Sequence, residues 1–258
     1  MIFFSSLRKE LMELVRTSKL IIMLAVMVAF GLASPLMARY TPEILSLIPE
    51  TAILAEIIPE PTLLDAISQF MENTYQFGFI LGILLTMGSF VKEKDLGTVS
   101  MILVKPISRS TFILAKFLAL AISFLVSIII ASLGAYYYST ILFAPPELTA
   151  WILMTLVLWL LILVYVALTL AFSTLSGSQA LGAGVSFGMM LVFSLLGFLP
   201  SLKPFSPTYL MTWAGNQFLN STLRAGNAVN GWPSLLVSLG IITVSLIISS
   251  ITLKNQEF

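Results

Sequence analysis

The chain has no cysteine and no histidine among its 258 residues. The absence of cysteine excludes a disulfide framework, a thiolate metal site and a cysteine nucleophile. The absence of histidine removes the most common general base and zinc ligand, and with them motifs of the HExxH type. We therefore expect no catalytic, cofactor-binding or metal-binding residue on this chain.

Charge is also scarce, since 10% of the residues are charged, 58% are hydrophobic and the mean hydropathy is +1.02. A soluble domain could not cover its surface with so few charges, so the sequence predicts an integral membrane protein. Six windows without Asp, Glu, Lys or Arg approach the roughly 20 residues that a helix needs to cross a bilayer. These windows are residues 20–38, 74–91, 117–138, 151–172, 180–199 and 232–253.

Such continuous apolar runs are typical of helices, because the strands of a membrane barrel alternate in polarity and are about half as long. The predicted fold class is an all-α polytopic membrane protein, with one transmembrane domain over residues 1–258. Residues 1–19 are expected to form an amphipathic interfacial helix in the headgroup region, because Phe3, Leu7, Leu11, Leu14 and Val15 recur at helical spacing beside basic residues.

The basic residues predict the orientation of the chain in a cell membrane. Cytoplasmic N- and C-termini place ten of them inside and three outside, which agrees with the positive-inside rule. Residues 39–73 and 200–231 are then external segments. Short surface helices are expected between the prolines of the first one. Thr62 and Asp65 have the form of a capping box, so a helix is expected to start there and run on into the second span. The inside set is Arg8, Lys9, Arg16, Lys19, Lys92, Lys94, Lys105, Arg109, Lys116 and Lys254, and the outside set is Arg39, Lys203 and Arg224.

Residues 92–110 form a short charged segment between the second and third apolar windows. Gly97 allows the backbone to break after the second span, and Thr98 is a good N-cap. Residues 99–104 then have room for one or two helical turns, and Pro106 ends the helix. The sequence therefore predicts one short cytoplasmic helix in this loop.

This short helix carries an apolar face made by Val99, Ile102 and Leu103. Charges of both signs surround the face, and they belong to Glu93, Lys94, Asp95, Lys105 and Arg109. Such a helix suits insertion into a groove on a soluble partner. A plain hairpin that dips into lipid headgroups has the same composition, so the residues alone leave both readings open.

The loop resembles the signature that follows the second span in type-2 permeases of ATP-binding-cassette (ABC) transporters. The matching residues are Glu93-x-x-x-Gly97-Thr98, Leu103-x-x-Pro106-x-Ser108-Arg109 and then Lys116. The layout of six spans, an amphipathic N-terminal helix and cytoplasmic termini is also similar to that family. One residue departs from the pattern, since Ser100 stands where many members carry an acid.

The resemblance implies that residues 92–110 hold a coupling helix that docks on a separate, soluble ABC ATPase subunit. The implied ATPase interface is Glu93, Gly97, Thr98, Val99, Ile102, Leu103, Pro106 and Arg109. It also implies a dimer with a second copy or a paralogue, ATP and Mg bound by the partner alone, and export as the direction. Consistent with that, the chain has no GxxxxGK[ST] phosphate loop. We expect lipid as its surroundings and no nucleic-acid partner.

Two other classes of function compete with this reading. An ion-coupled secondary transporter usually needs an ionisable group within the bilayer, and the six windows contain none. An intramembrane enzyme without histidine or cysteine would need a serine–lysine pair at depth, and no lysine lies in the windows. Within the favoured family, the mild polarity of the spans fits an amphipathic cargo, and it also fits a subunit that only transmits force.

Overall fold

The computed structural model describes residues 2–49, 59–95, 108–223 and 229–255. Helices dominate these residues, and no β-strand occurs among them. Six of the helices are long and apolar enough to cross a membrane, which confirms the predicted all-α membrane fold. The elements are α1 (Ile2–Arg16), α2 (Lys19–Ser46), α4 (Leu63–Asp95), α6 (Arg109–Leu142), α7 (Leu148–Ser176), α8 (Gln179–Leu196), the 3₁₀ turn η1 (Lys203–Phe205), α9 (Tyr209–Leu223) and α10 (Trp232–Asn255).

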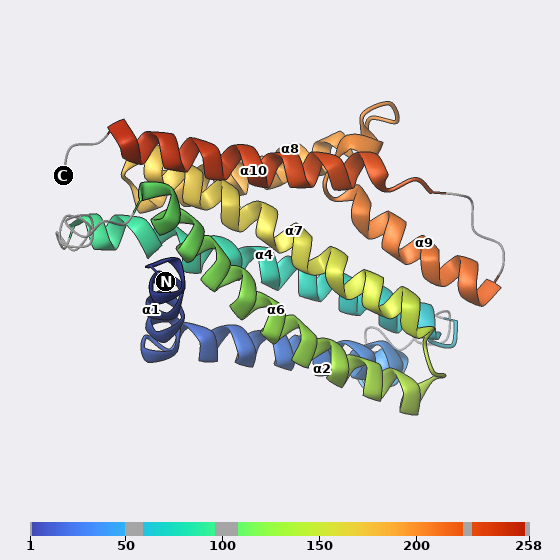
Figure 1. Cartoon of the computed structure of the whole chain (residues 1–258). Coiled ribbons are helices and arrows are strands. Elements are labelled where there is room, and N and C mark those ends of the chain that lie inside the picture. The colour runs from blue at the N-terminus through green and yellow to red at the C-terminus, as the bar shows by residue number, and fades with distance from the viewer. Residues whose placement is uncertain (1, 50–58, 96–107, 224–228, 256–258) are drawn as a thin grey trace.

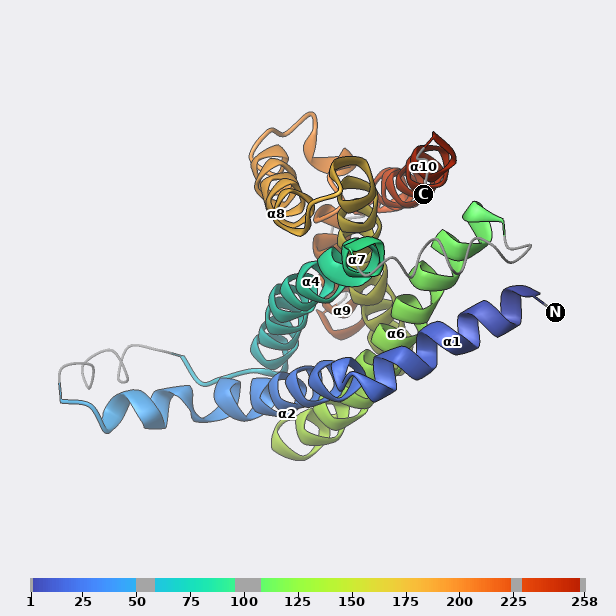
Figure 2. The same cartoon turned by 90° about the vertical axis from the view of Figure 1, so that its left-hand side faces the viewer.

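The six long helices run side by side as a bundle, and α1 lies transverse to them at one end (Figure 1). The end of α4, the start of α6 and both termini of the chain lie at this same end, whereas α9 lies near the other. Figure 2 looks onto the first end and shows α1 crossing in front of α2 and α6. The last residues of α4 and the first residues of α6 therefore lie at the same end of the bundle as α1.

Helix α7 is the central helix of the bundle. Of its most apolar window, 72% is buried, against 22% for the corresponding windows of α8 and α10. It contacts α4, α6, α8, α9 and α10. Its sequence is apolar around the whole circumference, which is the pattern of a helix surrounded by other helices.

Helices α2 and α6 approach each other closely at Gly31. A Cβ atom added to Gly31 would lie 2.8 Å from both the Cβ and the carbonyl oxygen of Ala131. Small residues allow such approaches between membrane helices, where van der Waals packing supplies much of the association energy. Near this contact the rings of Phe30 and Phe77 stack at 3.5 Å between centroids and join α2 to α4.

We expect Gly31→Ala to destabilise the fold by about 1–3 kcal/mol, because the new methyl group forces two helix backbones apart. Gly240→Ala is the matched control, since a Cβ at Gly240 on α10 meets nothing within 4 Å. That variant should stay within about 0.5 kcal/mol of the parent. Denaturant unfolding in detergent micelles measures both, and equal stabilities would contradict the close approach.

The first external segment, predicted over residues 39–73, is helical at both of its ends. Helix α2 continues through Pro42 to Ser46, and α4 already begins at Leu63. Prolines are tolerated in membrane helices because neighbouring groups satisfy the freed carbonyls. The start of α4 was foreseen, since Thr62 donates from its backbone N and its Oγ1 to the Asp65 carboxylate at 2.8 and 2.7 Å.

The segment between the last two spans contains α9, a helix that we did not predict from the sequence. Leu210, Ala214 and Phe218 recur at four-residue steps and are buried. They pack in one cluster with Trp151 of α7, whose ring meets that of Phe218 edge to face. The periodic signal was present, but it is shorter than a span and stands among prolines and polar residues.

Candidate functional site

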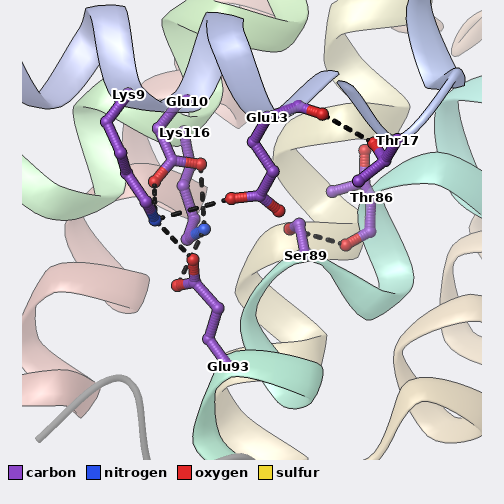
Figure 3. Close-up of polar contacts among 8 residues, drawn as sticks. All are labelled: Lys9, Glu10, Glu13, Thr17, Thr86, Ser89, Glu93 and Lys116. Carbon is purple, nitrogen blue, oxygen red and sulfur yellow. Dashed lines mark hydrogen bonds and ion pairs between the residues drawn. The ribbon is translucent and has the colours of Figure 1, made fainter. Parts of the chain in front are cut away.

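A cluster of charged side chains joins three helices at the end of the bundle where α1 lies (Figure 3). Helix α1 contributes Lys9, Glu10 and Glu13, which its helical spacing brings toward the bundle. Helix α4 contributes Glu93, two residues beyond the end of its apolar stretch at Val91. Helix α6 contributes Lys116, seven residues after its first residue.

Four of these side chains form a closed ring of alternating charge, which we call the ion-pair ring. The Lys9 ammonium lies 2.9 Å from Glu10 Oε1 and 2.6 Å from Glu93 Oε1. The Lys116 ammonium lies 3.0 Å from Glu10 Oε2 and 2.9 Å from Glu93 Oε2. Each carboxylate therefore contacts both lysines. Glu13 lies outside the ring, 3.5 Å from Lys9.

The ring is largely shielded from solvent on the side that faces the bundle. The exposed fraction of the side chain is 1% for Lys116, 9% for Glu10 and 11% for Glu93, but 42% for Lys9. The ring of Phe112 covers the Lys116 ammonium at 5.0 Å. A buried charge is costly unless it is paired, so the pairing of these three buried groups offsets the cost of burying them.

The pKa values of two ring members reflect this pairing. Burial by itself raises the pKa of Glu93, but the charge of Lys116 and hydrogen bonds from Lys9 and Lys116 outweigh it and hold that pKa below the ordinary 4.5. Burial by itself lowers the pKa of Lys9, but the charges of Glu10 and Glu93 and hydrogen bonds to both raise it above the ordinary 10.5. Glu93 and Lys9 are thus both ionised near neutral pH.

These shifts predict how stability depends on pH. The lowered pKa of Glu93 gives stability that is present above pH 4.5 and is lost as pH falls through the folded-state value. The raised pKa of Lys9 gives stability that is present below pH 10.5 and is lost as pH rises further. We expect a stability plateau between these limits, measured as the midpoint of thermal unfolding in detergent.

Glu93→Gln should flatten the acid side of this profile, because the group that binds the proton is gone. Glu147→Gln is the control, since Glu147 precedes α7 and makes no side-chain cap. An acid limb of equal slope in the parent, Glu93→Gln and Glu147→Gln would contradict the assignment of this pH dependence to the ring.

Three carboxylates of the cluster are close enough to be considered as metal ligands. One oxygen from each of Glu10, Glu13 and Glu93 lies within 4.8 Å of the others. However, Lys9 Nζ lies within 3.5 Å of a carboxylate oxygen of all three. The ammonium group takes the place that a divalent cation would need, so the residues fit an ion-pair network better than a metal site.

The apolar stripe that we predicted for α1 packs mainly on protein. Leu14 is buried, and Leu7 and Leu11 pack against the main hydrophobic core. Helix α1 contacts α6 and α2. Val15, the fifth residue of the predicted stripe, is 52% exposed. The ion-pair ring and this apolar contact together bind α1 to the ends of the spans.

Helix α6, which follows residues 96–107 in the chain, begins with an N-cap. Ser108 Oγ accepts a hydrogen bond from the backbone N of Thr111 at 3.1 Å and starts α6. The Arg109 guanidinium donates to the backbone carbonyl of Leu253, in the last turn of α10. A cation is favourable there, because the final carbonyls of a helix lack intrahelical donors. Of these two residues of the predicted signature, Ser108 caps α6 and Arg109 joins α6 to α10.

Of the eight residues predicted to contact an ATPase, the structure describes two. Glu93 belongs to the ion-pair ring, and Arg109 contacts α10, so the structure places both against internal partners. Direct contacts from either to an ATPase stay predictions. Gly97, Thr98, Val99, Ile102, Leu103 and Pro106 lie outside the described residues, as does the short helix expected there.

Sequence reasoning missed three members of the ring: Lys9, Glu10 and Lys116. Lys116 was included in the family signature, but no partner was assigned to it. Glu10 carried a usable signal, because it falls on the same face of α1 as Leu7 and Leu14. A carboxylate on an apolar face needs a buried cation.

Polar side chains within the spans are largely satisfied inside the bundle. The hydroxyls of Tyr75 and Tyr165 lie 2.7 Å apart and join α4 to α7. Thr169 donates to Ser186 at 2.9 Å and joins α7 to α8. Tyr165, Thr169 and Ser186 contribute to the mild polarity of the spans that fits an amphipathic cargo, and in the structure they hold helices together.

Comparison with known proteins agrees with this architecture. The family model described as "ABC-2 family transporter protein" matches residues 4–258. The chain is also 27% identical over 203 residues to the "Uncharacterized transmembrane protein YxlG" of Bacillus subtilis (strain 168), a match that covers 75% of this chain and 77% of that protein. The family match spans most of α1, all six long helices and the residues between α4 and α6. The chain therefore belongs to the ABC-2 family, as a membrane-spanning permease subunit of an ABC transporter.

Proposed function

We propose that this chain is the permease subunit of an ATP-driven exporter and that residues 92–110 couple it to a separate ATPase. ATP hydrolysis then takes place on the partner, which moves a substrate or transmits force through the permease. The observation that supports this proposal most is the ion-pair ring, because it ties the base of the loop at Glu93 to α1 and α6.

The ring gives the loop a mechanical connection to the bundle. Glu93 is three residues before the segment 96–107, and Arg109 follows that segment. On one side of the segment Glu93 contacts Lys9 and Lys116, and on the other side Arg109 contacts α10. A displacement of the loop by an ATPase is thereby passed to α1, α4, α6 and α10 together. Rigid-body movement of packed helices is an established form of such transitions.

We also propose a dimer whose interface includes α8. The sequence has two glycine pairs at GxxxG spacing, Gly78 with Gly82 and Gly184 with Gly188. The first pair packs inside the protomer, since Cβ atoms at Gly78 and Gly82 would contact Ile162 and Val166 of α7. Cβ atoms at Gly184 and Gly188 would meet nothing within 4 Å. These two glycines face away from the protomer, and a second permease can approach α8 closely there.

The proposed orientation places α1 and residues 92–110 in the cytoplasm. The charge distribution supports it, since ten basic residues lie on that side and three on the other. Because the chain has no native cysteine, Ser46→Cys at the end of α2 introduces a single thiol. A membrane-impermeant maleimide should label it from outside intact cells, and labelling only after lysis would reverse the orientation.

The experiment that tests the function is gentle purification of the tagged chain from its own host, followed by mass spectrometry of its stoichiometric companions. We expect one soluble phosphate-loop ATPase per permease, and two permeases per complex. A folded chain that purifies without any ATPase would contradict the coupling proposal. That result would favour the ion-coupled carrier that the sequence left open.

A further inference from the structure

The face of α1 that points away from the bundle carries two arginines and several apolar side chains. Phe4, Met12 and Val15 are 72%, 41% and 52% exposed. Arg8 and Arg16 stand two turns apart on this face, roughly 12 Å along the helix axis. Together with Leu11, Met12 and Val15 they line an open hollow of about 250 Å³.

The charge of this face is positive and unbalanced. Glu10 and Glu13 of α1 turn toward the ion-pair ring, and their carboxylates balance the charge of Lys9 there. Within the described parts of the chain, no carboxylate forms an ion pair with Arg8 or Arg16. The arginines are therefore available for an anionic ligand, whereas the exposed apolar groups between them favour a ligand with a hydrocarbon part.

The position of α1 fits a ligand that belongs to the membrane. The helix lies transverse to the spans at their ends and continues into α2 after Thr17 and Ser18 (Figures 1 and 2). A helix in this position, with arginines beside exposed apolar side chains, meets headgroups and the upper part of acyl chains. Anionic lipids attract such basic residues electrostatically.

We propose that the hollow lined by Arg8, Leu11, Met12, Val15 and Arg16 binds an anionic phospholipid. The guanidinium groups contact its phosphate and headgroup, and the apolar side chains contact its acyl chain. The assignment to the inner leaflet rests on the proposed orientation, but binding itself does not depend on it. The site would place a lipid directly on the helix that the ion-pair ring joins to the coupling loop.

The test uses Met12→Cys, a single thiol in the hollow, labelled with bimane and reconstituted in phosphatidylcholine vesicles. Brominated phosphatidylglycerol or brominated phosphatidylcholine is then added as a quencher in both leaflets. We expect an apparent preference for phosphatidylglycerol of about 25-fold, since each arginine near the surface contributes roughly fivefold. Glycerol phosphate in solution should not compete, because it lacks the acyl chain.

Adding Arg8→Gln and Arg16→Gln together should abolish the preference, and either alone should leave about fivefold. Arg39→Gln is the matched control, because Arg39 is an exposed arginine on α2, away from the hollow, and its loss should change nothing. Equal quenching by both lipids in the parent would overturn the proposal, as would quenching by neither, which would mean that the hollow faces away from lipid. Effective competition by glycerol phosphate would identify a site for soluble anions. The measurement needs no ATPase, so its outcome is independent of the coupling proposal.

Discussion

Replacing Lys116 with methionine is expected to destabilise the folded chain by about 3–5 kcal/mol, the usual result of removing one partner from a buried ion pair. The methionine fills a similar volume, but it leaves the carboxylates of Glu10 and Glu93 with one lysine where they had two. Both are largely buried, so water cannot replace the lost cation. Denaturant unfolding in detergent micelles gives the change in free energy.

A second variant separates the ion-pair ring from general damage to packing. Lys116→Met combined with Glu93→Gln removes one charge of each sign and leaves the pair of Lys9 with Glu10. The double variant should therefore be more stable than the sum of the two single changes predicts, by about 0.5–3 kcal/mol. Lys254→Met, at the exposed end of α10, is the control. If Lys116→Met costs no more than Lys254→Met, the ring does not contribute to stability.

Loss of the ring should also be visible locally. Helix α1 keeps its apolar contacts through Leu7, Leu11 and Leu14, but it loses the buried cation that joins it to α6. We therefore expect backbone amides of α1 to exchange faster with solvent in Lys116→Met, while those of the central α7 change little. Exchange rates report such local opening separately from global unfolding.

The six spans were predictable because the signal for them is local. A sufficiently long run of apolar residues without charge predicts a membrane-spanning helix by itself. Each of the six windows falls largely within one observed long helix. The ends were less predictable. Helix α2 extends beyond its apolar window and through Pro42, because neighbouring helices decide whether a proline breaks a helix. Thr62 and Asp65 predicted the start of α4 correctly, since a capping box is also local.

The ion-pair ring was not predictable in the same way, because its members are far apart in sequence. Lys9 is 84 positions from Glu93, and Glu10 is 106 positions from Lys116. These side chains come together because α1 folds back over α6, and no local sequence pattern predicts that arrangement of the two helices. The glutamate on the apolar face of α1 showed only that a buried cation was needed, and the sequence offers several lysines.

The family signature itself has two kinds of residue, which the structure begins to separate. Glu93, Ser108 and Arg109 form contacts within the chain, at the two ends of the loop. The apolar residues Val99, Ile102 and Leu103 lie outside the described residues, and their place at an ATPase surface stays a prediction. A family signature can thus combine residues that fix the ends of a loop to the bundle with residues that are predicted to contact the partner.

Leu103→Asp is expected to abolish docking of the ATPase and to leave the fold of the permease unchanged. If Leu103 fills an apolar groove on the partner, a carboxylate there is desolvated without a counter-charge. Loss of such a central contact costs at least about 2 kcal/mol, or roughly 30-fold in affinity. Co-purification of the ATPase measures docking, and unfolding in detergent measures the fold. Leu202→Asp is the control, because Leu202 is an exposed leucine between α8 and α9.

Glu93→Arg provides the contrast that separates the two kinds of residue. The variant places a third cation beside Lys9 and Lys116, so it should lower the stability of the permease as well as its activity. Leu103→Asp should lose the ATPase at full stability, whereas Glu93→Arg should lose stability first. If Leu103→Asp retains the ATPase with unchanged affinity, the coupling helix is wrongly assigned. If Glu93→Arg loses the ATPase at parental stability, Glu93 contacts the partner directly and the ion-pair ring is not its main role.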